Sequence, residues 1–474
     1  MNSKRIACVA VAMAMTIAAG TAAAADLTPF QTRAREIYAK VISIPSQLGN
    51  NKVPAVAEYL AGEFRAAGFP AEDIHILPFK GTGDDTASLV VRYRASGKSG
   101  HKPIVLLAHM DVVTAKRADW VRDPYTLVEE NGYFYGRGTY DDKQGVTALT
   151  ATFLRLKAEK YVPDRDIILY FSGDEETAQD TAADAVKNHR DLVDAEFALN
   201  ADAGGGTLDE KSGKALYFTM QTAEKYYADF AVITHNPGGH SSQPRADNAI
   251  FDIAAAIDKL RALRFPMMSN ETTLAQLEAA SVRTPGDLGK AFAAFAANPH
   301  DEAAAAVIWK DPAYVGLTRT TCIPTMIDGG HAPNALPQSV KLNVNCRIFP
   351  GHELEDVRRT LQDTVGQGAD VAVVGSPLSS DPSPLRKDIM DAVTRAVHAI
   401  QPEATVVPGQ GSGASDSLLF RAAGIPAYGV DGNFMKASDD FSHGLNERLS
   451  TQSFYDSLTY WHTLLKDLTS KRKH

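Results

Sequence analysis

Histidine and carboxylate side chains recur along this chain where apolar runs end. PIVLLAH, DIILYFSG and EFALNAD end in such residues or are followed by them, and further groups lie in GRGTYDDKQG and SHGLNE. The side chains are His109, Asp111, Asp141, Asp142, Asp174, Glu175, Glu176, Asp202 and His443. Taken singly, each carboxylate has an ordinary interpretation as a turn residue or helix cap. A single histidine is likewise often structural.

Taken together, these side chains indicate a metal centre. So many carboxylates at one edge of a sheet would repel one another unless a cation lay among them. Two histidines and three carboxylates form a donor set that suits Zn²⁺, with Co²⁺ or Mn²⁺ as alternatives. A further carboxylate is then free to act as a general base. Two metal ions ~3.5–4 Å apart, bridged by a carboxylate and a water, would make that water a nucleophile. The chemistry indicated is metal-assisted hydrolysis, most simply of an amide.

The elements that carry these residues alternate between strand and helix. Apolar, β-branched runs predict strands at 74–79, 88–94, 103–109, 166–173 and 196–204. Helical spacing predicts helices within 28–69 and over 144–160 and 181–193. This alternation is typical of an α/β sheet covered on both faces. Ligands of such sheets bind at the carboxyl ends of the strands, where the histidines and carboxylates lie.

The pattern changes near residue 226 and returns near 376. The alternating strand YYADFAVITH is followed by PGGHSSQP, a helix and an Ala-rich helical segment over roughly 271–310. Two more strands, TTCIPTMIDGG and SVKLNVNCRIF, are joined by HAPNALPQ. The sequence therefore predicts an α/β domain formed by 26–225 and 376–474, interrupted by a smaller α+β domain over 226–375.

Residues 1–25 read as a secretory signal peptide. Lys4 and Arg5 precede an apolar stretch over 6–19, and residues 22–25 offer an A-x-A cleavage site. The stretch is too short for a stable membrane anchor. We therefore expect a secreted protein, periplasmic or extracellular, with no membrane span.

The composition excludes several other classes of protein. The 474 residues are 22% charged and 44% hydrophobic, which is ordinary for a globular protein and too apolar for disorder. Acidic residues outnumber basic ones by 57 to 48. This balance offers no basic surface for nucleic acid.

The chain resembles a known family at the motifs above. LLAHMDVV, GRGTYDDKQG, SGDEE, NADAGG, PGGHSSQP, GGHAPNALP and SHGLNE follow the order of the co-catalytic dizinc metallopeptidases. That family (peptidase clan MH) includes aminoacylase, carboxypeptidase G, carnosinase and carboxypeptidase S, and PGGHSSQP, APNALP and HGLNER are most similar to the carboxypeptidase S branch. The resemblance implies a zinc-peptidase catalytic domain with a mixed sheet covered by helices, interrupted by an α+β lid and dimerisation domain.

The resemblance also implies roles for residues of the catalytic domain. Two Zn²⁺ per subunit would be bound, one by His109 and Asp202, the other by Glu176 and His443, with Asp141 bridging both. Glu175 would be the general acid/base that takes a proton from the bridging water and returns it to the leaving amine. Asp111 would orient the ring of His109. The Asp141–Asp142 peptide is similar to one that is cis in the family.

Three residues of the predicted lid receive roles in the same way. His240 would polarise the scissile carbonyl or hold the oxyanion. Arg347 would bind a substrate carboxylate through its planar fork, and Asn334 would donate a further hydrogen bond to substrate. The alternatives are a turn residue for His240 and a structural salt bridge for Arg347. In a homodimer like that of carnosinase-type members, His240 would serve the zinc site of the neighbouring subunit.

We expect an exported zinc metallopeptidase of short peptides, with carboxypeptidase or dipeptidase specificity. An N-acyl-amino-acid amidohydrolase would use the same machinery with a different side pocket. A third alternative is a catalytically silent binding protein on the same fold, although every expected ligand and Glu175 are present.

Two cysteines remain after the predicted cleavage. Cys322 and Cys346 lie on two predicted strands, equally far from the middle of the connection between them. An antiparallel hairpin centred there would place them opposite each other, close enough to bridge. An oxidising compartment would permit that disulfide; the alternative is a pair of small buried hydrophobic residues.

Overall fold

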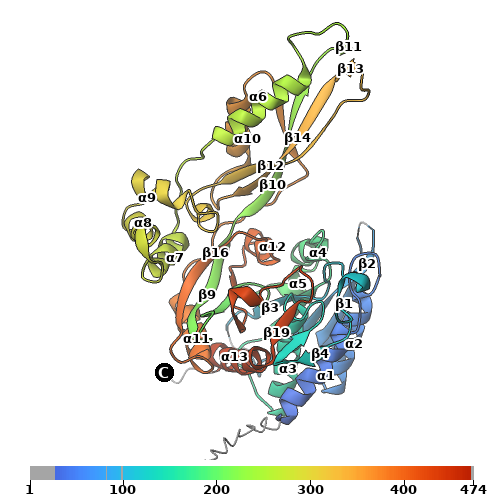
Figure 1. Ribbon diagram of the computed structural model, residues 1–474. Coiled ribbons are helices and arrows are strands. Elements are labelled where there is room, and N and C mark those ends of the chain that lie inside the picture. Colours follow the sequence, from blue (N-terminus) through green and yellow to red (C-terminus); the bar gives the residue numbers. More distant parts are fainter. Residues whose placement is uncertain (1–26, 82, 98–99, 471–474) are drawn as a thin grey trace, which may run out of the picture.

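The computed structural model describes residues 27–81, 83–97 and 100–470 (Figure 1). The predicted signal peptide lies outside the described residues. Within the described ranges, no helix is both long and apolar enough to cross a membrane.

A ten-stranded mixed sheet forms the centre of the larger domain. Its order is β1-β2-β6-β3-β7-β17-β9-β8-β18, with β16 paired to β9. The strands are β1 (Ile74–Lys80), β2 (Asp85–Tyr93), β3 (Ile104–His109), β6 (Ile167–Ser172), β7 (Phe197–Asn200), β8 (Gly205–Leu208), β9 (Ala215–Glu224), β16 (Thr405–Gly411), β17 (Ala427–Gly429) and β18 (Phe434–Met435). β6, β3, β7 and β17 run parallel. Their carboxyl ends therefore meet at one edge of the sheet.

Helices cover both faces of this sheet, as the sequence pattern predicts. One face packs against α1 (Pro29–Ile42), α2 (Val53–Ala66), α3 (Lys143–Ala158), α11 (Lys387–His398) and α13 (Thr451–Thr469). The other packs against α4 (Asp180–Asn188), α5 (Arg190–Val193) and α12 (Ser417–Ala422). Every residue of β3 and β6 is buried, because strands covered on both faces read as continuous apolar runs.

The smaller domain is built on a four-stranded antiparallel sheet of order β12-β14-β10-β15. Its elements are β10 (Tyr226–His235), α6 (Ala249–Ala262), β12 (Thr321–Gly329), β14 (Ser339–Ile348), α10 (Leu354–Val365) and β15 (Asp370–Val374). Alternate residues of β10, such as Phe230 and Val232, pack with α6 and α10 in a separate core. Figure 1 shows this lid standing away from the large sheet, with β11 (Gly239–His240) and β13 (Ala335–Leu336) at its far end.

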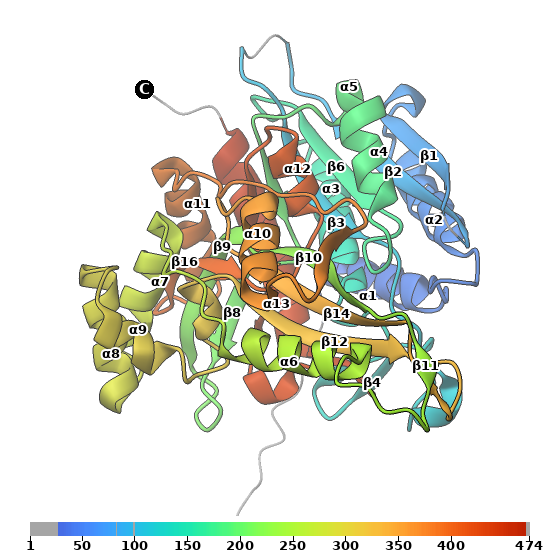
Figure 2. The ribbon, with the colours of Figure 1, turned by 90° about the horizontal axis from the view of Figure 1, so that it is seen from above.

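The Ala-rich segment forms three helices with a core of their own, α7 (Glu271–Ser281), α8 (Gly286–Ala297) and α9 (Glu302–Ile308). α7 lies beside β16 of the large sheet (Figures 1 and 2). There Gln276 Oε1 accepts the backbone N–H of Gln410 at 2.9 Å, and Asn270 Nδ2 donates to Gln410 Oε1 at 3.1 Å. These helices interrupt the lid sequence and pack on the catalytic domain.

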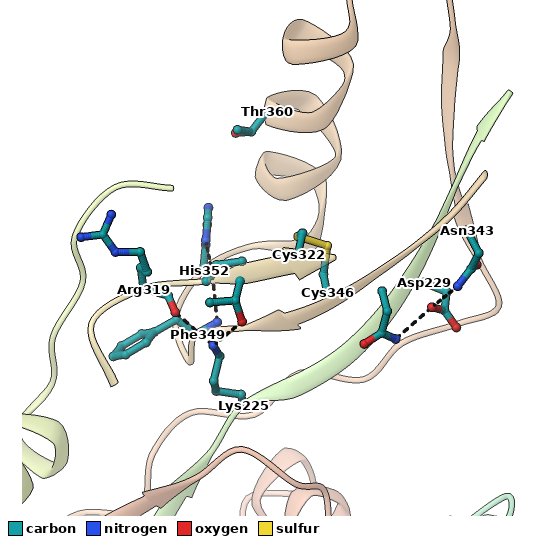
Figure 3. Close-up of a disulfide and its surroundings, with 12 residues drawn as sticks. Lys225, Asp229, Arg319, Cys322, Asn343, Cys346, Phe349, His352 and Thr360 are labelled. Atoms are coloured by element: carbon teal, nitrogen blue, oxygen red, sulfur yellow. Dashed lines mark hydrogen bonds between the residues drawn. A yellow bond between two sulfur atoms is a disulfide. The ribbon is translucent and has the colours of Figure 1, made fainter. Parts of the chain in front are cut away.

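The predicted disulfide is confirmed. Cys322 and Cys346 are directly paired in the β12–β14 ladder and their sulfurs are bonded (Figure 3). The bond joins edge strand β12 to the interior of the lid sheet, close to Lys225 and Arg319 (Figure 3).

Several strands have no clear sequence signal. β16 reads TVVPGQG, and proline and glycine are both uncommon inside strands. Its pairing with β9 outweighs this composition. β4 (Val128–Glu130), β5 (Tyr133–Tyr135) and β19 (Arg448–Ser450) form a small separate sheet. That sheet joins the region before α3 to the segment that carries His443.

Candidate metal centre

Three of the predicted ligands lie at the carboxyl ends of parallel strands. His109 is the last residue of β3, Glu176 follows β6, and Asp202 follows β7. Asp141 comes just before α3, and His443 lies between β18 and β19 with a φ of +59°. The fold brings all five predicted ligands together.

The carboxylate of Asp141 lies between the two histidines. Its Oδ1 is 3.0 Å from Nε2 of His109, and its Oδ2 is 3.0 Å from Nε2 of His443. Nε2 of His109 also lies 3.5 Å from Oδ1 of Asp202, while Nε2 of His443 lies 2.9 Å from Oε2 of Glu176. Asp141 therefore lies between two sets of possible metal ligands, His109 with Asp202 and His443 with Glu176. This arrangement suits two cations bridged by the carboxylate of Asp141.

The electrostatics of the cluster fit divalent cations. Burial would lower the pKa of His109, but Asp202 and Asp141 raise it well above its usual value. Burial raises the pKa of Asp202 to about 6. Oε1 of Glu176 is buried without a hydrogen-bond partner in the described part of the chain. Donor atoms of His109, Asp141 and Glu176 all lie within 4.8 Å of one another. Bound cations would offset the repulsion between these carboxylates and would give the unpartnered Oε1 of Glu176 a partner.

Asp111 connects the two strands that supply the first ligands. Nδ1 of His109 lies 3.1 Å from the backbone oxygen of Asp111 and 3.5 Å from its Oδ1. The carboxylate of Asp111 accepts the backbone N–H groups of Glu175 and Glu176, both at 3.1 Å. Asp111 thus fixes the position of His109 relative to the Glu175–Glu176 segment.

Glu175 is a carboxylate beside the centre that contacts neither histidine. Its Oε1 accepts a hydrogen bond from Nε2 of Gln179 at 2.9 Å. Burial and the charge of Asp202 raise its pKa well above the usual range. This position matches the spare carboxylate that the sequence predicts as general base.

Two further acids that the sequence did not assign hold the Asp141 segment in place. The Asp141–Asp142 peptide is cis, and Oδ2 of Asp142 accepts the backbone N–H of His109 at 3.1 Å. Glu447 is fully buried, accepts the N–H of Asp141 at 3.1 Å and pairs with Arg137 at 2.7 Å. The one sequence signal for Glu447 is its place in the motif that contains His443.

Two cavities adjoin the centre. One of about 270 Å³ is lined by both Asp141 and Asp202, together with Gly413, Ala414 and Ser415. The other, of about 280 Å³, shares Tyr140, Gly204 and Asp440 with the first and continues along Gly205, Gly206, Tyr217 and Met435. Together they offer room for substrate groups beside the Asp141 and Asp202 carboxylates.

The structure does not bring the three predicted lid residues to the centre of the same chain. His240 and Asn334 lie together at the far end of the lid, where Asn334 O accepts the N–H of Ser241 at 3.0 Å. Nδ1 of His240 lies 2.8 Å from the hydroxyl of Ser242, and the side chain of His240 is exposed. Arg347 lies at the base of the lid, where its Nη1 donates to Ser412 O at 3.3 Å.

The chain is similar to known hydrolases in sequence and in fold. The model for peptidase family M20/M25/M40 matches residues 105–467. The human N-fatty-acyl-amino acid synthase/hydrolase PM20D1 is 26% identical over 377 residues, covering 77% of this chain and 74% of the relative. The probable carboxypeptidase S-like 2 of Dictyostelium discoideum is 25% identical over 392 residues, 80% of this chain and 74% of the relative. The M20 metallo-carboxypeptidase Sso-CP2 of Sulfolobus solfataricus has the same fold, with a TM-score of 0.68 and 16% identity over 91% of this chain and 98% of its own.

Proposed function

The chain belongs to peptidase family M20/M25/M40 and is a metal-dependent hydrolase, and we propose that it is an exported zinc enzyme that hydrolyses amide bonds of short peptides. The observation that carries the proposal is the position of Asp141 between His109 and His443, 3.0 Å from each. Bound divalent cations would polarise the scissile carbonyl and lower the pKa of water.

The residues of the chain perform the remaining steps. Glu175 takes a proton from the attacking water and returns it to the leaving nitrogen. Asp111 fixes the backbone of Glu175, at 3.1 Å, and Gln179 holds its carboxylate. Burial and the charge of Asp202 raise the pKa of Glu175, which is the direction expected for a carboxylate that must also donate a proton.

Two substrate classes fit this machinery. We propose peptides, cleaved by a carboxypeptidase or dipeptidase, as the principal class. N-acyl amino acids are the second candidate, favoured by the 26% identity to human N-fatty-acyl-amino acid synthase/hydrolase. The second cavity, beyond Tyr140 and Gly204, offers room for a further group of such a substrate.

Export is proposed from the N-terminal sequence. Lys4 and Arg5 precede the apolar stretch and the alanine-rich cleavage site. The disulfide between Cys322 and Cys346 supports this proposal, because disulfides persist in oxidising compartments.

A homodimer through the lid is also proposed. The lid carries His240 at its far end, exposed and remote from the metal centre of its own chain (Figure 1). The edge strand β12 exposes Ile323, Met326 and Ile327, by 64%, 71% and 59%. Unpaired edges with exposed apolar side chains are available for pairing with a second sheet. A second subunit bound at this edge would supply another metal centre, on which His240 could act.

The substrate class can be tested directly. Protein beginning at residue 26, supplied with Zn²⁺, is incubated with a library of peptides and N-acyl amino acids, and the products are identified by mass spectrometry. Release of single C-terminal residues supports carboxypeptidase activity, cleavage of dipeptides alone supports a dipeptidase, and deacylation alone supports the second candidate. Zinc-loaded protein that cleaves none of them would support the silent binding protein and contradict the proposal.

A further inference from the structure

The two cavities beside the metal centre meet at Tyr140. The first, of about 270 Å³, is lined by Asp141 and Asp202, whereas the second, of about 280 Å³, is lined by neither. Tyr140, Gly204 and Asp440 line both cavities. A substrate group that starts at the metal centre and reaches the second cavity therefore passes these three residues.

Of these three residues, Tyr140 has by far the largest side chain. Gly204 has none, and a Cβ there would lie 2.4 Å from the backbone oxygen of Gly429. The carboxylate of Asp440 is held by the backbone N–H of Ser442 at 3.1 Å and by the hydroxyl of the same residue. The size of the opening between the cavities thus depends on the ring of Tyr140.

The backbone of Tyr140 is fixed, whereas its hydroxyl group is not. Its N–H donates to Oε1 of Glu447 at 2.7 Å, and the N–H of Asp141 donates to the same oxygen. Among the residues that the structure describes, the hydroxyl of Tyr140 has no hydrogen-bond partner. The side chain packs against the core of the catalytic domain. The ring is therefore held at the boundary by packing, and its bulk rather than its hydroxyl should control passage.

The first cavity alone is small. Sites for drug-sized ligands span about 300–1,000 Å³, and the first cavity lies below this range. It suits a single residue or a short acyl group, and a longer group needs the second cavity as well. The lining of the second cavity includes the polar residues Thr207, Thr219, Asn433 and Lys436. A fatty acyl chain would desolvate these polar groups without pairing them.

The leaving amino acid of the substrate is expected at another wall of the first cavity. Arg347, which the resemblance assigns to the substrate carboxylate, donates to Ser412 O at 3.3 Å. Residues 413–415, which follow Ser412, line the first cavity and not the second. A leaving amino acid at this wall leaves the Tyr140 side of the cavity for the acyl group.

We propose that Tyr140 is a specificity-determining residue that limits the acyl side of the substrate to about one residue. Dipeptides and short N-acyl amino acids then bind, and longer peptides bind weakly because the ring of Tyr140 excludes a second residue. The inference rests on the proposed amide hydrolysis and on the predicted role of Arg347, and it favours dipeptidase over carboxypeptidase specificity.

The test measures binding without turnover. In a Glu175→Gln background loaded with Zn²⁺, calorimetry compares peptides with one, two or three glycines before a C-terminal leucine, phenylalanine, lysine or glutamate. We expect the dipeptides that bind to bind at least tenfold more tightly than the longer peptides with the same C-terminal residue. Adding Tyr140→Ala should reduce this preference at least tenfold, whereas Tyr140→Phe should keep it because the bulk of the ring remains.

Tyr59→Ala is the matched control. The side chain of Tyr59 is partly buried against the same core as that of Tyr140, and it lines neither cavity. Zinc content is measured for every variant. Tyr140→Leu is a second variant that keeps an apolar side chain against the core, so the test does not depend on the folding of Tyr140→Ala.

A further substitution locates the added residues of the longer peptides. Met435 lines the second cavity, and Met435→Trp in the Tyr140→Ala protein should fill that cavity and restore the preference for dipeptides. Binding of longer peptides that persists in this double variant would contradict the role of the second cavity.

Three results would overturn the inference. They are equal or absent binding of dipeptides and longer peptides by the Glu175→Gln parent, an unchanged preference in folded, zinc-loaded Tyr140→Ala and Tyr140→Leu proteins, and loss of the preference in Tyr140→Phe. A preference that depends on the ring of Tyr140, in a protein whose unsubstituted form cleaves none of these peptides, would instead refute the proposed function and leave the size limit standing.

Discussion

The backbone N–H of Asp141 donates to Oε1 of Glu447 at 3.1 Å, although the two residues are 306 positions apart. The other carboxylate oxygen of Glu447 accepts from Arg137 at 2.7 Å and from the N–H of Gly138 at 3.0 Å. A single buried carboxylate thereby fixes the segment that presents Asp141, the carboxylate predicted to bridge two cations. Because Glu447 follows His443 by four residues, it also joins the segments that carry two of the predicted ligands.

Glu447→Gln should weaken metal binding about 10–100-fold, as loss of groups that orient ligands generally does. The amide replaces one acceptor oxygen with a donor that faces existing N–H donors. Competition with a chromophoric chelator measures the affinity. Glu210→Gln serves as control, since Glu210 accepts hydrogen bonds from Ser438 at the surface. Unchanged affinity in Glu447→Gln would contradict its positioning role.

The Cys322–Cys346 bond closes a loop of 24 residues, for which the loss of unfolded-state entropy contributes about 3 kcal/mol. The double substitution Cys322→Ala, Cys346→Ala should lower the free energy of unfolding in urea by roughly that amount. Thiol counting on unreduced, denatured wild-type protein is the accompanying check. Two reactive thiols there would show that the bond does not form.

Lys225 should make stability depend on pH. Burial and Arg347 lower its pKa from 10.5 to about 7 in the folded protein. Between these values the unfolded chain binds more protons, so the Lys225 contribution to the free energy of unfolding rises with pH, by up to about 1.4 kcal/mol per unit. Arg347 is the charged group that faces it; Arg319 O and the Thr321 hydroxyl are neutral.

The comparison is between wild type and Lys225→Met, unfolded in urea at several pH values from 7 to 10.5. The stability of wild type relative to the variant should increase steadily across this interval. A difference that stays constant, or that falls as pH rises, would show that Lys225 keeps its ordinary pKa in the fold.

His240 should act on the neighbouring subunit's centre. Inactive His240→Ala and inactive Glu175→Ala proteins are mixed, dissociated and reassociated. If His240 acts on the centre of the other subunit, each mixed dimer has one centre that lacks both His240 and Glu175 and one centre that has both. Activity should therefore return. Mixed dimers without activity would place His240 in its own site, and a protein monomeric at assay concentration would exclude the trans arrangement.

Three of the predicted ligands could be placed from the sequence pattern because they end or follow clear strands, whereas the resemblance to a known family implied the full set of five. His109 ends an uninterrupted apolar strand, and Glu176 and Asp202 follow two more. The role of Glu447 was not predictable, since it depends on a contact across 306 positions and its one local signal is its place in the motif that contains His443. The sequence did not single out Lys225 for a related reason: that no carboxylate of the described residues pairs with its ammonium group is a property of the folded chain. β16 was missed because Pro408 and two glycines disfavour a strand that β9 stabilises by pairing.

The proposed mechanism gives the neighbouring residues Glu175 and Glu176 different roles, general base and metal ligand. Metal content and turnover are measured together on Glu175→Gln, with Glu176→Gln as its partner variant. We expect Glu175→Gln to keep its metal ions and to lose at least ~10² in kcat because the general base is lost, whereas Glu176→Gln should lose metal. Normal turnover in Glu175→Gln, or loss of its metal ions, would contradict the general-base role of Glu175.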